Sequence, residues 1–176
     1  MCSPASMIVT KNKVHWLPWC DSHEEIIKKY GLNDTGRDPG FVRVEITPEN
    51  NDYRIPHDKW GYRVDQDYLP DWYNPIECES AARAELPAWY EKHIITEGKH
   101  EIDGSLCRDL SVIVLGGEVT ITGQTGGNCR ALDNATLNAT GQTGGGCWAW
   151  DNATLNATGQ TGGNCRAWDN ATLNKK

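Results

Sequence analysis

Small apolar and polar residues alternate along the C-terminal third of the chain. In residues 135–140 (Ala-Thr-Leu-Asn-Ala-Thr) every second side chain is small or apolar, the period-two pattern of a β-strand with one buried face. A second short strand is predicted at residues 129–132, with Cys129 and Ala131 facing inward. Glycine-rich and Asp-Asn stretches separate the strands and have the composition of turns.

This pattern occurs three times with a period of 18 residues and no insertion. A unit this short cannot bury an apolar face alone, so the copies must stack. Two strands and two turns form one coil of a β-solenoid, in which residues 18 apart lie about 4.8 Å from each other. Shifted by 18, Val119 and Ile121 coincide with Leu137 and Ala139, which predicts one degenerate first coil before the three visible repeats.

The first hundred residues contain different patterns. Residues 7–10 and 13–16 read as a short hairpin, and residues 41–46 and 60–65 read as two further strands that can pair. We therefore predict an α+β N-terminal domain over residues 1–110, followed by a short β-solenoid over residues 111–176 with two short strands in each coil.

Two helices complete the predicted N-terminal domain. Ser22 with Glu25 three residues later forms a capping box, and Gly31 ends the helix that follows. Asn74-Pro75 opens a second helix that meets Pro87, which must either kink it or begin another helix over residues 88–95.

The Thr-x-Asn and Ala-Thr-Leu phrases of the repeats resemble the short-period solenoids of bacterial ice-nucleation proteins and of bacterial and phage proteins with similar repeats. The resemblance covers about residues 117–174 and implies the solenoid fold and a phage or prophage origin. Ice nucleation in that family depends on much longer arrays, and its repeats have a different period. The N-terminal domain carries no such resemblance.

Composition narrows the possible partners. The net charge of -7 without a lysine-arginine cluster argues against nucleic acid, because phosphate binding needs a concentrated basic face. No apolar run reaches the roughly 20 residues of a membrane span. The N-terminus lacks the basic and apolar regions of a signal peptide, so we expect a cytoplasmic protein.

The chain has seven cysteines. An odd number without an export signal predicts reduced thiols rather than a disulfide framework. The three cysteines of the repeats are expected to be small buried hydrophobic residues.

Candidate chemistry in the N-terminal domain begins with Cys20 and His23. A cysteine near histidines fits a thiol nucleophile, and Cys-x-x-His is half of a zinc site whose other ligands would come from Cys78, His57 or Cys107. The alternative, which we favour, places His23 in the first turn of a helix beside its cap.

A second candidate is the acidic stretch that includes Asp65 and Asp67. Paired carboxylates can act as acid and base or hold a divalent cation, whereas the alternative is an acidic loop before a helix. We favour the loop and predict no metal and no cofactor. Whether the domain is catalytic stays open, with Cys20, His23, Asp65 and Asp67 as the candidate catalytic residues.

The outward residues of the repeats form two different faces. One is a flat polar face of threonines and asparagines. The other carries arginine and tryptophan in one column and leucine and tryptophan in the next, and such surface patches usually mark a contact. The polar face comprises Thr136, Asn138, Thr140, Thr154, Asn156, Thr158, Thr172 and Asn174, and the second face comprises Arg130, Trp148, Arg166, Leu132, Trp150 and Trp168.

After Asn174 the sequence has two lysines, so we expect the last coil to expose strand edges together with Cys165, Ala171 and Leu173. A contact between two solenoids would cover these groups and the tryptophans. The sequence therefore predicts a homodimer through the repeats.

These patterns favour a non-catalytic interaction protein. Its solenoid would dimerise or space the N-terminal domains, and these would engage a protein or a small ligand. One alternative is an enzyme with its site in the N-terminal domain. Another is ice binding through the threonines and asparagines of the polar face.

Overall fold

The computed structural model describes residues 5–34, 40–141, 144–159 and 162–175. The chain divides into two compact units, Met1–Glu91 and Lys92–Lys176.

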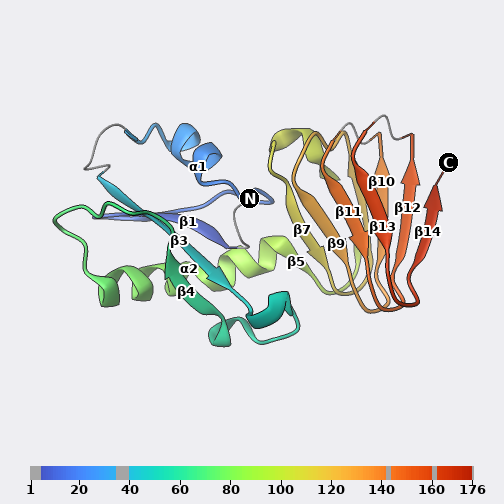
Figure 1. The fold of residues 1–176 in the computed structure, drawn as a ribbon, viewed down its shortest axis with the longest axis horizontal. Helices are drawn as coiled ribbons and strands as arrows, with labels where there is room; N and C mark the ends of the chain where they lie inside the picture. The colour runs from blue at the N-terminus through green and yellow to red at the C-terminus, as the bar shows by residue number, and fades with distance from the viewer. Residues whose placement is uncertain (1–4, 35–39, 142–143, 160–161, 176) are drawn as a thin grey trace. The chain divides into compact units, whose positions relative to one another are not determined.

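The N-terminal unit contains a four-stranded antiparallel sheet in the order β2-β1-β3-β4 (Figure 1). The predicted hairpin and the predicted pairing of the two later strands are both confirmed. The strands are β1 (Ser6–Thr10), β2 (Val14–His15), β3 (Phe41–Thr47) and β4 (Gly61–Val64), with 3-10 turns at Glu49–Asn51 and His57–Lys59.

Helix α1 (His23–Tyr30) begins and ends where the sequence predicts. The Ser22 side chain accepts a hydrogen bond from the Glu25 backbone N–H, which leaves fewer unsatisfied donors at the first turn. Gly31 takes the left-handed conformation at the C-cap, with φ +62°. Ile26 and Ile27 on the inner side of the helix pack in one apolar cluster with sheet residues Ile8 and Phe41.

Helix α2 (Pro75–His93) also starts at its predicted cap. The Asn74 side chain accepts hydrogen bonds from the backbone N–H groups of Ile76 and Glu77. The helix continues through Pro87 as a single element. Residues 94–95, expected to continue a helix, instead form a short strand, which is the first strand of the solenoid.

The sheet of the N-terminal unit has α1 against one face and α2 against the other. Val9 follows Ile8 in β1 and so points to the opposite face, where it lines a groove together with Ala81 of α2. Trp60 and Trp89 are fully buried, with ring centroids 6.1 Å apart in an edge-to-face contact.

The second unit is a β-solenoid of about four turns, built from two parallel five-stranded sheets (Figure 1). One sheet has the order β14-β12-β10-β8-β6 and the other β13-β11-β9-β7-β5. The strands are β5 (Ile94–Ile95), β6 (Lys99–Asp103), β7 (Ser111–Val114), β8 (Glu118–Thr122), β9 (Asn128–Ala131), β10 (Thr136–Thr140), β11 (Gly146–Ala149), β12 (Thr154–Thr158), β13 (Asn164–Ala167) and β14 (Thr172–Lys175), with a 3-10 turn at Gly104–Leu106.

The register of the solenoid confirms the 18-residue period. Leu137 pairs with Leu155, and Leu155 in turn with Leu173. Val119 pairs with Leu137, so the degenerate first coil is placed as the sequence predicts. The inward side chains of the middle coils, including Cys129 and Leu137, are fully buried.

The stacking starts earlier in the chain than the repeated phrase. Strands β5 and β6, within residues 94–103, pair in parallel with β7 and β8. The solenoid sheets therefore begin before residue 111, the predicted start of the solenoid. Their offset is 19 residues, as in the pairing of Lys99 with Glu118, and it differs from the period of the visible repeats. That mismatch hides this rung from a search for internal repetition.

Candidate functional site

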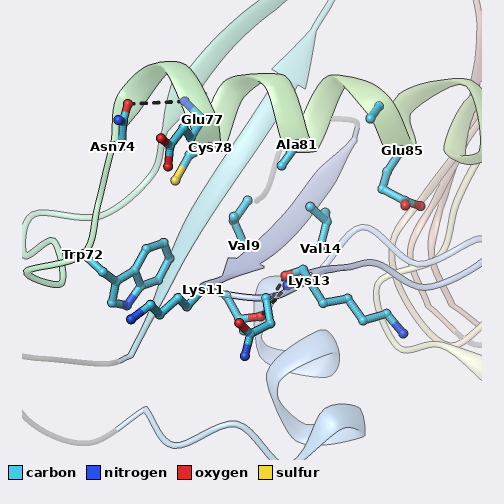
Figure 2. A pocket seen from close by; sticks show the side chains of 13 residues that line it. Val9, Lys11, Lys13, Val14, Trp72, Asn74, Glu77, Cys78, Ala81 and Glu85 are labelled. Atoms are coloured by element: carbon cyan, nitrogen blue, oxygen red, sulfur yellow. Dashed lines mark hydrogen bonds between the residues drawn. The ribbon is translucent and has the colours of Figure 1, made fainter.

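A groove of about 580 Å³ lies within the N-terminal unit, between the β1–β2 hairpin and α2 (Figure 2). Valines 9 and 14 come from the hairpin, and Cys78 and Ala81 come from the facing side of the helix. Figure 2 shows Trp72 at one end of the groove and Glu85 toward the other. The sequence analysis did not predict this groove, because its two walls are more than sixty residues apart in the chain.

The Cys78 thiol is free and buried. Burial raises its pKa, because a thiolate loses solvation there; the hydrogen bond with the Asn74 backbone lowers the pKa by a smaller amount. The thiol is therefore protonated near neutral pH and forms part of an apolar wall rather than a nucleophile.

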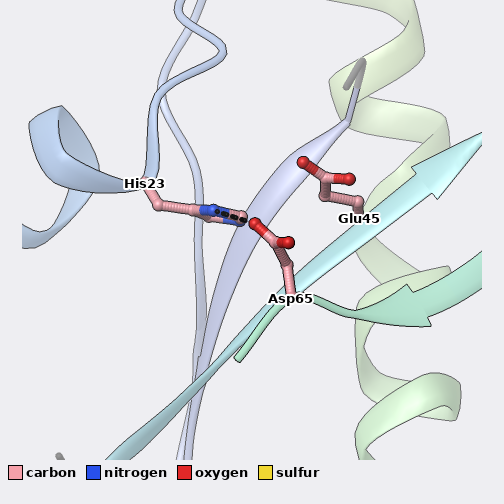
Figure 3. Close-up of side chains that lie close together, drawn as sticks. All are labelled: His23, Glu45 and Asp65. Atoms are coloured by element: carbon pink, nitrogen blue, oxygen red, sulfur yellow. Dashed lines mark ion pairs between the residues drawn. The ribbon is translucent and has the colours of Figure 1, made fainter. Parts of the chain in front are cut away.

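A cluster of titratable side chains lies beside α1 in the same unit (Figure 3). The cap at Ser22 puts His23 in the first turn of α1, and Glu45 and Asp65 come from β3 and the residue after β4. Their potential ligand atoms all lie within 4.8 Å of one another. His23 and Glu45 are each 1% exposed, whereas Asp65 faces solvent with 44% of its side chain.

Each member of this cluster already has a partner. The His23 ring lies with Nε2 3.1 Å from the Val44 carbonyl and Nδ1 3.5 Å from Asp65 Oδ2. The Arg63 guanidinium donates from Nε to Glu45 Oε2 at 2.6 Å and also contacts that oxygen through a terminal nitrogen. A cation could use the same imidazole and carboxylate atoms, but Arg63 already supplies the positive charge at Glu45. The geometry therefore fits a structural charge network.

Of the four candidate catalytic residues, the structure brings His23 and Asp65 together, with His23 Nδ1 3.5 Å from Asp65 Oδ2. Asp67 is exposed, and neither it nor Cys20 belongs to the cluster found among the described residues. Glu45 was not predicted, because the alternation of β3 puts it on the face opposite Val44 and Ile46, where a solvent-exposed carboxylate is expected, yet it is 1% exposed.

The prediction that the cysteines are reduced is wrong for two of them. Cys20 and Cys107 are disulfide-bonded, so the Cys20 sulfur is not a thiol available for catalysis or zinc in this structure. Cys129, Cys147 and Cys165 are buried and are not in a disulfide, as expected for small apolar residues in the repeats.

The solenoid carries an aromatic–arginine face, which we define as Arg130, Trp148, Trp150, Arg166 and Trp168. The guanidinium of Arg130 lies 5.5 Å from the centroid of the Trp148 ring. Trp148 meets Trp150 edge-on at 6.0 Å, and Trp150 stacks on Trp168 at 4.9 Å with an interplanar angle of 12°. Trp168 keeps 39% of its surface exposed, so the aromatic cluster reaches solvent.

Two leucines predicted for this contact surface are more covered than expected. Leu132 is 9% exposed, and Leu173 is half-buried. Cys165, expected to be exposed in the last coil, is 4% exposed. Ala171 is half-buried.

The flat polar face has the predicted regularity. Thr136, Thr154 and Thr172 are in register. The asparagine rank forms a hydrogen-bonded ladder, in which the Asn156 amide donates to Asn138 Oδ1 at 2.7 Å and accepts from Asn174 at 2.8 Å. The ladder links adjacent coils, so the asparagines have a structural role whatever else the face does.

No family model, curated protein or solved structure matches this chain. Within the part of the chain that the structure describes, no helix is both long and apolar enough to cross a membrane.

Proposed function

We propose that this chain is a non-catalytic binding protein that forms a homodimer through the aromatic–arginine face of its solenoid. The observation that carries the proposal is the aromatic cluster itself, in which Trp148 and Trp150 of one coil and Trp168 of the next are held at fixed spacings and reach solvent at Trp168. Exposed aromatic and arginine side chains are enriched in protein contacts.

A second copy of the same chain is the occupant that the charges favour. The repeats that present Arg130 and Arg166 also present Asp133 and Asp169 at their turns, and the repeat between them presents Asp151. A two-fold contact needs a patch that is complementary to itself, and a face with cationic and anionic columns side by side meets that need. The tryptophans would supply the apolar centre of the contact.

The titratable cluster of the N-terminal unit supports a binding role more than a catalytic one. Its imidazole and its buried carboxylate are committed to Val44, Asp65 and Arg63. A general base needs a lone pair that can reach a substrate proton. Ligand engagement by the groove of this unit is the role we assign to it instead.

Ice binding through the flat polar face is a second candidate, because its threonines lie in register on successive coils. The side-chain amides of the asparagine ladder hydrogen-bond to one another, so fewer of their donors and acceptors are left to bind an ice surface. Thermal hysteresis of the purified protein tests this candidate, and a melting–freezing gap that Thr154→Val abolishes would favour it over the dimer.

A charge exchange tests the dimer. Arg166→Glu and Asp169→Arg, each alone, are expected to weaken self-association about threefold to tenfold in sedimentation equilibrium, since each places like charges opposite each other. The double variant restores the opposite-sign pairing and is expected to recover most of the loss. Glu49→Arg, in the N-terminal unit, is the control and should leave association unchanged. If Arg166→Glu and Asp169→Arg leave the strength of self-association unchanged, the proposed interface is contradicted.

A further inference from the structure

We propose that the groove between the β1–β2 hairpin and α2 binds a small organic anion with an aromatic body. This inference rests on the proposed binding role of the N-terminal unit and assigns a ligand class to it. It does not depend on the solenoid contact.

The groove has the size and walls of a small-molecule site. Its volume of about 580 Å³ falls within the range of roughly 300–1,000 Å³ that ligand pockets have. Val9, Val14 and Ala81 supply apolar surface between the sheet and the helix (Figure 2). The Trp72 indole closes one end and can pack against a planar ring.

One rim of the groove is cationic. Lys11 and Lys13 flank Asn12 in the hairpin turn, and all three line the groove. The turn is held by the Thr10 hydroxyl, which donates to the Lys13 carbonyl at 2.8 Å and accepts from the Lys13 N–H at 3.1 Å. Neither ammonium group forms an ion pair with another residue that the structure describes. The rim thus offers two positive charges on a fixed backbone.

The helix side of the groove determines where the anion must lie. Glu77 and Glu85 project from α2. Glu85 accepts a hydrogen bond from the Trp16 indole at 3.1 Å, which fixes its carboxylate at the end away from Trp72. A ligand carboxylate would be repelled there, so it lies at the lysine rim while the ring lies over the apolar wall. The protonated Cys78 thiol is part of that wall and forms no covalent bond with the ligand.

Indole-3-acetate and indole-3-acetamide are matched probes for this arrangement, because they share the ring and differ in charge. Titration of the full chain, followed by methyl NMR of valine and alanine residues, is expected to show indole-3-acetate binding with a dissociation constant on the order of 1 mM. The Val9, Val14 and Ala81 signals should shift. The uncharged amide is expected to bind about threefold to tenfold more weakly at low salt, since it loses the contacts to both lysines.

Two pairs of variants separate charge from shape. Lys11→Gln with Lys13→Gln should reduce indole-3-acetate binding to the level of the amide, whereas Lys28→Gln with Lys29→Gln on α1 should not change it. Ala81→Leu fills the groove and should abolish binding of both probes. Ala88→Leu, at an exposed position of the same helix, should leave both unchanged.

Equal binding of the acid and the amide would overturn the assignment of an anion. The absence of binding at 10 mM probe, on the order of ten times the expected dissociation constant, would overturn the groove as a ligand site. Shifts confined to residues outside the groove would do the same. None of these results bears on the mass of the protein in solution, so failure of this inference is distinguishable from failure of the proposed dimer.

Discussion

The two units of this chain show two ways of building a surface. In the solenoid, one outward position recurs every 18 residues, so equivalent positions form a column along the stack, as Thr136 does with Thr154 and Arg130 with Trp148. In the N-terminal unit, each cluster of side chains is assembled once from distant segments, as with His23, Glu45 and Asp65. Repetition therefore favours extended contacts with another large surface, whereas the single-copy unit favours a compact site for a small ligand.

The largest expected difference between the units concerns glycines in left-handed conformations. Gly127, in a solenoid turn, has φ +74°, and a side chain there would collide with the backbone of Leu110. Gly127→Ala is expected to cost roughly 3 kcal/mol or more, because the stacked coils must separate. Gly31, the C-cap of α1, has φ +62° and open space around it, so Gly31→Ala is expected to cost about 1–2 kcal/mol.

Urea denaturation followed by circular dichroism measures both glycine variants. Equal losses of unfolding free energy would contradict the claim that coil stacking leaves no room at the solenoid turn.

The next effect concerns the buried carboxylate of the N-terminal unit. Arg63→Ala leaves Glu45 buried without its ion-pair partner and is expected to cost about 1–3 kcal/mol, a value reduced from fully buried pairs because Arg63 is largely exposed. Lys59→Ala removes an exposed lysine and serves as the control, with an expected change within about 0.5 kcal/mol. Thermal unfolding of each variant and of the wild type measures the loss of stability. A loss no larger for Arg63 than for Lys59 would show that Glu45 does not need the arginine.

Comparison of the two units also explains what the sequence could predict. The solenoid was predictable in strand positions, register and inward residues, because each coil sees copies of itself 18 residues away. Its first rung, at residues 94–103, was not predictable, because β5 and β6 pair with β7 and β8 although their sequences lack the repeated phrase. Local signals such as Ser22 and Gly31 likewise predicted α1.

The contacts of the N-terminal unit were less predictable, because they join residues far apart in the chain. His23 and Asp65 could be selected as polar residues near aromatic ones, but their meeting depends on how β3 and β4 pair. The disulfide state of Cys20 and of Cys107 was missed because an odd cysteine count gives no pairing information. The groove combines two segments whose sequences carry no shared motif.

A smaller effect tests the asparagine ladder of the solenoid. Asn156→Ala removes the middle amide and breaks hydrogen bonds to both neighbouring coils, at an expected cost of about 1–2 kcal/mol. Asn134→Ala, at an exposed turn position of the same repeat pattern, should change the free energy of unfolding by less than about 0.5 kcal/mol. Chemical denaturation distinguishes the two. Identical midpoints would mean that the ladder does not stabilise the stack.

The smallest expected effect concerns how the free energy of unfolding depends on pH. The Lys99 side chain, with help from Asn138, lowers the pKa of the Glu118 carboxyl below its usual value of 4.5. Because the folded-state pKa is lower than the unfolded one, this group stabilises the fold above the unfolded value. That stabilisation is lost as the pH falls through the folded value. Glu118→Gln is therefore expected to lower stability slightly near neutral pH, where the carboxylate is charged, and to change nothing at a pH below the folded-state pKa, where Glu118 is protonated. Chemical denaturation at neutral and at acidic pH compares the two, and a loss at acidic pH as large as the loss at neutral pH would contradict this account.

The central claim is that the aromatic–arginine face joins two copies of the chain. Light scattering coupled to size-exclusion chromatography, over a range of protein concentrations, tests it most directly. We predict a mass of twice the 19.6 kDa chain for the wild type, moving toward a single chain for Trp168→Ser combined with Arg166→Glu. A wild-type mass of one chain at every concentration, or a dimer that these substitutions leave intact, would contradict the claim.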